Sequence, residues 1–250
     1  MDFLANYFGS LNPMSFLSAL PGNIAQGIIW GLMGLGVFLT FKLLNFADLS
    51  VDGSFATGGA VTAVMLINGC PVWATIIVAI LAGLAAGLVT GLLHTLLGIP
   101  DILAGILTQI ALYSINLNIM GKSNLPISYR NYTLVVSASN INMAILVGLG
   151  ICAVVIAAMY WYFGTEQGST IRSTGSNPAM SKAQGININF TKVIALALSN
   201  GLVALSGSLF AQYQGFADIN MGRGAIVIGL AAVILSLIHI SEPTRRTPIS

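Results

Sequence analysis

The sequence predicts an all-α polytopic membrane protein. Of its 250 residues, 56% are hydrophobic and 6% are charged, and the mean hydropathy is +0.90. A soluble domain carries about 25% charged residues, so this chain has too few to cover a surface that faces water. Uncharged apolar runs recur along the chain, several of them close to the roughly 20 residues that a spanning helix needs. The runs are continuous and do not alternate in polarity, which favours helices over a β-barrel.

About seven spanning or re-entrant helices are expected, at residues 24–41, 53–68, 72–97, 101–120, 142–163, 193–212 and 224–240. The second and the last of these are short, which suits a kinked or partly re-entrant segment. Gly83, Gly87 and Gly91 form a ridge on the third helix, and Gly27 and Gly31 form one on the first. Small residues at this spacing let membrane helices approach closely, so a tightly packed bundle is expected.

A short motif occurs twice. Phe46-Ala47-Asp48 follows the first expected span and Phe216-Ala217-Asp218 follows the sixth, and each leads into a hydrophobic run rich in Gly and Ala. Five crossings separate the two copies, which is an odd number, so the copies should lie on opposite faces of the membrane. This arrangement is typical of an inverted-topology repeat, a common architecture of transporters.

The interiors of the expected spans contain no Asp, Glu, Lys or Arg, which argues against ion- or proton-coupled transport. The polar residues in or beside the spans are neutral. Each of them could form an interhelical hydrogen bond, or together they could line a path for a polar solute. The candidate lining residues are Asn45, Gln109, Asn116, Asn200 and Gln212, with Gln26 and Asn118 as further polar positions.

The segment 164–192 should contain a short helix. Asn177 is a good N-cap, Pro178 suits the first helical position, and Gly185 suits the position just beyond the end. Two interpretations remain open: a helix that lies on the membrane surface, or a docking helix for a cytoplasmic partner. The residues of interest are Asn177, Pro178, Ala179, Met180, Lys182, Ala183 and Gly185.

Several other functions are excluded or disfavoured. A net charge of +2 leaves no basic stripe for nucleic acid, and the two cysteines have no metal-ligand spacing. Gly121-Lys122-Ser123 is not a phosphate-binding loop, because Asn116 stands where that pattern requires glycine. His94 could be a proton relay or a packed histidine. The sequence therefore predicts no catalytic residue, metal site or cofactor.

Charge alone gives only a slight topological preference. If segment 164–192 is cytoplasmic, the inner side holds Lys42, Arg172, Lys182 and Lys192, and the outer side holds Lys122, Arg130 and Arg223. Four cations against three only weakly favour this orientation by the positive-inside rule.

A resemblance to a known family indicates the function and the orientation of the chain. Segments 44–48, 172–187, 215–222 and 229–231 resemble the ordered motifs of ABC importer permeases of the branched-chain amino acid and ribose type. Segment 98–105 is most similar to the subgroup that is paired with tryptophan- or tyrosine-type binding proteins. Arg223 departs from the family pattern, in which a small or apolar residue is usual.

The resemblance implies a permease subunit of an ATP-driven importer for a small polar solute, expected to be an amino acid. It implies three kinds of protein partner: cytoplasmic ABC ATPase subunits, an extracytoplasmic solute-binding protein and a second permease subunit, with a homodimer expected. The chain itself would span the lipid bilayer of a bacterial inner membrane. ATP hydrolysis would belong to the ATPase, so this chain would not be an enzyme. The helix at 178–184 would transmit ATPase closure to the spans, with segment 164–192 inside and the N-terminus and segment 121–141 outside.

Residues 1–234 are expected to form an incomplete transmembrane permease domain, and residues 235–250 are expected to be a non-native tail. Two alternatives remain: a secondary transporter with inverted repeats and no ATPase, and a channel.

Overall fold

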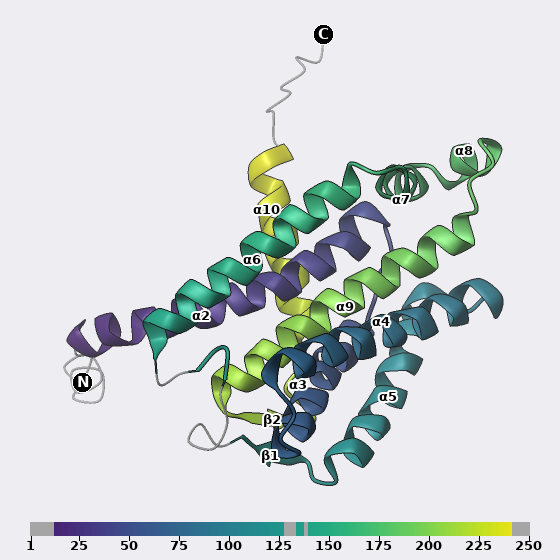
Figure 1. Ribbon diagram of the computed structural model, residues 1–250. Coiled ribbons are helices and arrows are strands. Elements are labelled where there is room, and N and C mark those ends of the chain that lie inside the picture. Colours follow the sequence, from purple (N-terminus) through teal and green to yellow (C-terminus); the bar gives the residue numbers. More distant parts are fainter. Residues whose placement is uncertain (1–12, 128–133, 138–139, 242–250) are drawn as a thin grey trace, which may run out of the picture.

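The computed structural model describes residues 13–127, 134–137 and 140–241. The helices are α2 (Pro13–Phe38), the π-helical turn η1 (Leu39–Leu43), α3 (Val51–Ile67), α4 (Val72–Leu96), α5 (Asp101–Met120), α6 (Ile141–Phe163), α7 (Glu166–Ser176), α8 (Pro178–Ala183), α9 (Ile188–Gln214) and α10 (Ala225–Ser241). Two short strands, β1 (Asn124–Pro126) and β2 (Phe216–Asp218), pair antiparallel. Figure 1 shows a bundle of helices with this small sheet at its lower edge.

The expected all-α polytopic membrane fold is confirmed. Five helices in the described part of the chain are long and apolar enough to cross a membrane: Ala19–Leu43, Val72–Leu96, Asp101–Met120, Ile141–Phe163 and Ile188–Gln214. Two shorter apolar helices, α3 and α10, correspond to the second and last predicted segments, which were expected to be short. The tail expected at 235–250 stays a prediction, because α10 continues to Ser241 and residues 242–250 lie outside the described ones.

Helix α9 lies at the centre of the bundle. It packs on α4 through the predicted glycine ridge, because a Cβ at Gly83 would overlap the carbonyl oxygen of Asn200 and one at Gly87 that of Leu196. The prediction that Gly27 and Gly31 form a second close helix contact is wrong for the described part of the chain. Gly27 and Gly31 have no atom within 4 Å of an added Cβ, and they line a hollow between α2 and α10.

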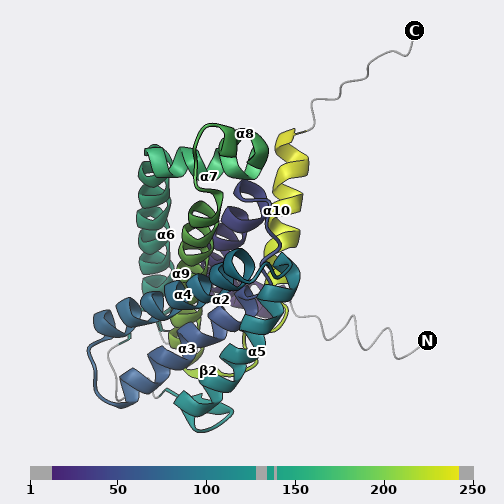
Figure 2. The same ribbon diagram turned by 90° about the vertical axis from the view of Figure 1, so that its right-hand side faces the viewer.

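The two ends of the bundle differ. Helices α7 and α8 lie across one end and the β1–β2 sheet lies at the other, with α9 running between them (Figure 2). Helix α2 is antiparallel to α9, because Ser199 Oγ donates to Gly36 O at 2.7 Å and Ser206 Oγ donates to Ile29 O at 2.6 Å.

The predicted repeat has a structural counterpart. In each copy a long helix, α2 or α9, is followed by the Phe-Ala-Asp motif and then by a 17-residue helix, α3 or α10. The aspartate makes the same turn in both copies: Asp48 Oδ1 accepts from Ser50 N at 2.9 Å, and Asp218 Oδ1 accepts from Asn220 N at 2.6 Å. The two short helices run in opposite directions, α3 toward the sheet end and α10 toward the α7–α8 end (Figure 2).

The first copy of the motif lies deeper in the bundle than the sequence suggested. Asp48 is only 2% exposed, and its carboxylate contacts Asn200, which lies halfway along α9. Asp48 lies between the first two expected spans, whose interiors contain no charged residue, so nothing in the sequence indicated this burial. Residues 44–50 follow η1 and pack back against the bundle, which buries the carboxylate within the protein.

Candidate functional site

The N-termini of α3 and α10 meet inside the bundle. Asp52, in the first turn of α3, accepts hydrogen bonds from Gly224 N at 3.1 Å and Ile226 N at 2.9 Å, at the start of α10. The approach is close, because a Cβ at Gly222 would overlap the carbonyl oxygen of Asp52. A carboxylate at a helix N-terminus is favoured by the helix dipole and satisfies N–H groups that have no partner within the helix. Asp52 thus joins the two repeats.

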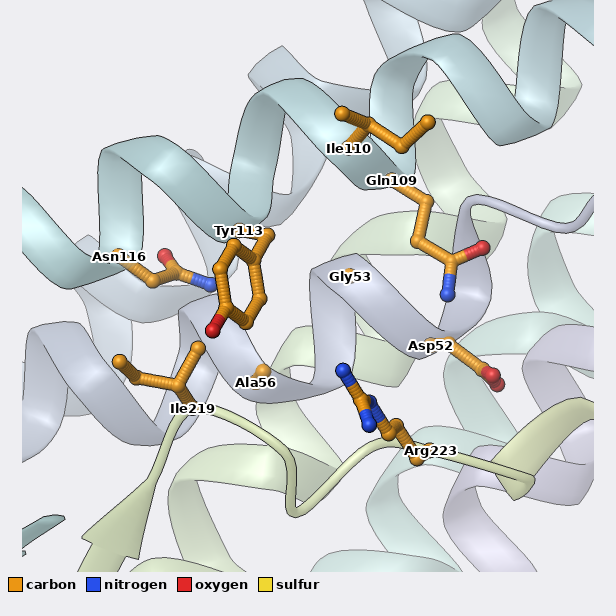
Figure 3. Close-up of a pocket in the computed structure, with 9 residues that line it drawn as sticks. All are labelled: Asp52, Gly53, Ala56, Gln109, Ile110, Tyr113, Asn116, Ile219 and Arg223. Atoms are coloured by element: carbon orange, nitrogen blue, oxygen red, sulfur yellow. The ribbon is translucent and has the colours of Figure 1, made fainter. Parts of the chain in front are cut away.

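A cavity of about 310 Å³ lies beside this junction. Helices α3 and α5 and the loop between β2 and α10 supply its lining residues: Asp52, Gly53, Ala56, Gln109, Ile110, Tyr113, Asn116, Ile219 and Arg223 (Figure 3). Its volume falls at the lower end of the range of small-molecule sites, about 300–1,000 Å³. A larger hollow near α7, of about 740 Å³, is lined mainly by apolar residues of α2 and α6 and lacks such a set of polar groups.

Four polar side chains of the cavity have no protein partner. Within the described part of the chain, the side chains of Gln109, Tyr113, Asn116 and Arg223 form no hydrogen bond or ion pair. Asn116 is fully buried, and both its Nδ2 and its Oδ1 are unsatisfied. A buried amide without partners costs free energy, of the order of 1–3 kcal/mol for each group. Such a group is explained when it faces a site that a ligand or water occupies.

Helix α5 carries three of these four side chains on one face. Gln109, Tyr113 and Asn116 are separated by four and three residues, the spacing that stacks side chains along a helix. Glycine lets this helix approach α3 closely, because a Cβ at Gly105 would lie 2.7 Å from Leu49 N and one at Gly53 would lie 3.0 Å from Leu112 Cδ1. The polar face of α5 is therefore held against the start of α3.

The structure brings together two of the five predicted lining residues, Gln109 and Asn116. Gln212 is buried near the sheet end, where its Oε1 accepts from Val135 N at 3.2 Å. Asn45 follows η1 with a left-handed backbone (φ 55°), a conformation that asparagine adopts more readily than most residues. Neither of these two residues reaches the cavity.

Asn200 belongs to a separate buried polar cluster. Its Nδ2 donates to Asp48 Oδ2 at 2.7 Å and to Leu196 O at 3.0 Å, and its Oδ1 accepts from the hydroxyls of Ser50 and Ser54. Every polar atom of the Asn200 amide is thus satisfied within the protein. The cluster ties the loop before α3 to the middle of α9, which is the interhelical role that the sequence left as an alternative.

His94 is a packed histidine in this structure. Its Nδ1 lies 2.9 Å from Ile99 O and its Nε2 lies 2.9 Å from Lys192 Nζ. Since an ammonium group only donates, Nε2 accepts and Nδ1 donates, which describes a neutral ring. Phe46 packs edge-on against this ring, with 5.1 Å between centroids.

The predicted short helix is present as α8. Asn177 is its N-cap and accepts from Met180 N at 3.0 Å, Pro178 occupies the first turn, and Gly185 has φ 82° just beyond the end. Ala179, Lys182 and Ala183 are exposed, as is Met180 at 57%, whereas Ser181 is buried. The helix therefore presents an exposed face, partly apolar, at this end of the bundle. Its role in coupling stays a prediction.

Sequence reasoning missed Asp52, Tyr113 and Arg223 as site residues. Tyr113 could have been found from its place between Gln109 and Asn116 on one helix face. Asp52 lies in the first turn of α3 and Arg223 lies in the loop just before α10, and only the fold brings them to one cavity. Helix α7 was also missed, although Thr165 and Glu166 carry the signal of a helix start.

Comparison with known proteins identifies the family. Residues 22–247 match the family described as branched-chain amino acid transport system / permease component. The chain is 44% identical over 222 residues to the tyrosine transport system permease protein of Clostridioides difficile (strain R20291), which covers 88% of this chain and 74% of the relative. It is 27% identical over 233 residues to the D-allose transport system permease protein of Escherichia coli (strain K12). This match covers 91% of this chain and 70% of the relative.

A third relative is an autoinducer 2 import system permease protein of Enterobacter sp. (strain 638), 28% identical over 233 residues, or 90% of this chain and 66% of the relative. No solved structure matches the chain. The chain belongs to the branched-chain amino acid transport permease family, which confirms the resemblance inferred from its motifs.

Proposed function

We propose that this permease chain is the membrane-spanning subunit of an ATP-driven importer for an amino acid. The cavity beside the α3–α10 junction would form part of the path of the solute. The observation that carries this proposal is the convergence of four unpartnered polar side chains at the meeting point of two opposed short helices. Transporters of inverted-repeat architecture bind substrate at such broken-helix junctions near the bilayer midplane.

An amino acid is the solute that the relatives and the site together favour. A relative that shares 44% of the matched residues is named for tyrosine transport. The cavity combines a guanidinium, two carboxamides and a phenol ring, which can serve the charged and the apolar parts of such a molecule.

The α7–α8 end is proposed to face the cytoplasm of a bacterial inner membrane. Lys42, Arg172, Lys182 and Lys192 lie at this end, and Lys122 lies at the sheet end. Arg223 lies in the loop between β2 and α10, two residues before the helix begins. Arg130 lies outside the described residues. Four cations against Lys122, Arg130 and Arg223 slightly favour a cytoplasmic α7–α8 end by the positive-inside rule.

Helix α8 is the proposed contact for a cytoplasmic ATPase subunit. The complete importer would contain two permease chains, a homodimer in the simplest case, and two ATPase subunits that hydrolyse ATP. Its exposed Met180 and Ala179 offer an apolar patch at the end of the bundle. The proposed partner at the sheet end is an extracytoplasmic solute-binding protein.

Co-elution of the ATPase with an affinity-tagged, full-length permease tests this proposal. Met180→Asp should abolish co-elution and uptake, because it would bury an unpartnered charge in an apolar contact. Burying even an uncharged polar group without a partner costs on the order of 2–7 kcal/mol, and a charge costs more. Ser123→Asp places the same charge on an exposed residue at the sheet end and should leave ATPase co-elution unchanged.

Two outcomes would contradict the proposal in different ways. If wild-type permease never captures an ATPase yet transports the solute, the chain works as a secondary transporter. If Met180→Asp retains both co-elution and uptake, α8 is only a connector and the ATPase docks elsewhere.

A further inference from the structure

We propose that Arg223 binds the carboxylate of the transported solute and selects for it. This inference deepens the proposed function and rests on it. It makes Arg223 a specificity-determining residue of the permease itself, in addition to any selection by a binding protein.

The backbone of Arg223 is fixed, but its side chain is free. The preceding Gly222 packs directly on the backbone of Asp52, and the following Gly224 donates its N–H to the Asp52 carboxylate at 3.1 Å. Arg223 N itself donates to Asn220 O at 3.0 Å. Arg223 is, by contrast, an exposed residue, and its guanidinium has no hydrogen-bond or ion-pair partner in the described chain.

Asp52 does not neutralise this guanidinium, although both residues line the cavity. The two oxygens of Asp52 are occupied by the N–H groups of Gly224 and Ile226, and no ion pair joins Asp52 to Arg223. In Figure 3 the side chain of Arg223 rises toward α3 and α5, whereas the Asp52 carboxylate points away from it. The carboxylate offsets the positive end of α10, which leaves the charge of Arg223 available to a ligand.

An unpaired arginine that lines a cavity between membrane helices needs an explanation. Charged side chains within a membrane bundle face water-filled cavities or partners and mark the paths of substrates. Guanidinium binds carboxylates through two parallel hydrogen bonds, a geometry that an ammonium group cannot reproduce. The cavity beside Arg223 therefore favours a solute that carries a carboxylate.

The other free groups fit the remainder of an α-amino acid. The amide oxygens of Gln109 and Asn116 can accept hydrogen bonds from an ammonium group. Tyr113 presents a ring between them, which can contact an apolar or aromatic side chain (Figure 3). The site is thus suited to a zwitterion, with Arg223 as its selective element.

Three probes that share one ring system test this inference in purified, full-length permease without binding protein. L-tyrosine carries both a carboxylate and an ammonium group, 3-(4-hydroxyphenyl)propionate carries only the carboxylate, and tyramine carries only the ammonium. Wild-type permease should bind L-tyrosine and 3-(4-hydroxyphenyl)propionate. It should bind tyramine at least tenfold more weakly than L-tyrosine, which is about the loss expected for one charged hydrogen-bonded pair.

Arg223→Gln should bind L-tyrosine at least tenfold more weakly than wild type, and Arg223→Lys should fall between them. Arg172→Gln is the matched control, because Arg172 is an exposed arginine of α7, outside this cavity. Should Arg223→Gln fail to fold, the probe series on the wild-type protein and Arg223→Lys still decide the question.

The inference is overturned if tyramine binds wild type as tightly as L-tyrosine, if neither carboxylate probe binds, or if Arg223→Gln binds L-tyrosine within twofold of wild type. Co-elution of the ATPase in the same preparations separates the two proposals. An intact complex without carboxylate selectivity refutes the role of Arg223 alone, whereas loss of the complex in the wild type refutes the importer.

Discussion

Replacing Asp52 by Asn should destabilise the permease, because Asp52 holds the N-terminus of α10 from another helix. The carboxylate accepts two backbone N–H groups, at 3.1 Å from Gly224 and 2.9 Å from Ile226. An asparagine offers one oxygen acceptor and turns an NH₂ donor toward the second N–H. The substitution changes few atoms, so packing against Gly222 should be preserved.

The magnitude follows from these bonds. Each hydrogen bond to a charged group contributes about 1.5–3 kcal/mol, and the one that asparagine retains contributes about 0.5–1.5 kcal/mol. Loss of the negative charge at the helix N-terminus adds about 0.3–1 kcal/mol. Because Asp52 is only partly buried, the lower part of the sum applies, and we expect a loss of about 2–3 kcal/mol in the free energy of unfolding.

Denaturant titration of the purified protein in mixed micelles measures this loss, and hydrogen exchange at residues 224–230 locates it. Asp101→Asn is the matched control, since Asp101 lies in the first turn of α5 and its side chain forms no hydrogen bond within the described part of the chain. The control should lose at most about 1 kcal/mol, the contribution of the helix dipole. Equal unfolding free energies for the two variants, with unchanged exchange at 224–230, would refute the role of Asp52 as the junction.

Two further substitutions test the packing of the bundle. Gly58→Ala should destabilise the protein more than Gly34→Ala, because an added Cβ overlaps the backbone of Ala204 in the first case and meets open space in the second. The Gly34 variant should be neutral or stabilised by up to about 1 kcal/mol. The free energies of unfolding of the two variants test this prediction. Asn200→Ala should lower the free energy of unfolding by about 3 kcal/mol or more, since it removes a partner of the buried Asp48 carboxylate. Asn189→Ala, at an exposed position, should change this free energy by less than about 0.5 kcal/mol. Similar values for both variants would exclude a structural role of the cluster around Asn200.

The sequence predicts the helices of this protein because spanning a bilayer demands long apolar runs, and such runs are visible without a structure. Helix α7 escaped prediction because it is polar and owes its place to contacts: a Cβ at Gly175 would overlap the carbonyl oxygen of Leu43 in η1. The β1–β2 pairing escaped it for a similar reason, since it joins segments about 90 residues apart.

The site was only partly predictable. Gln109 and Asn116 stand out in the sequence as amides within an apolar helix, and the structure places both in the cavity. Asn200 has the same signature but is satisfied by Asp48 and two serines, a difference that depends on how residues 44–50 fold back into the bundle. The sequence identifies which residues are polar, whereas the tertiary contacts decide which of them remain free for a ligand.

The inverted repeat explains why a carboxylate and a guanidinium meet at one cavity. Asp52 lies six residues after Phe46, in the first turn of α3, and Arg223 lies seven residues after Phe216, two residues before α10. The opposed copies bring both residues to their common junction. The two residues differ in role: Asp52 is bound to the backbone at the start of α10, while the Arg223 side chain has no such partner among the described residues. A symmetric scaffold thus produces an asymmetric site, in which the fixed acid holds the fold and the free base remains available for the solute.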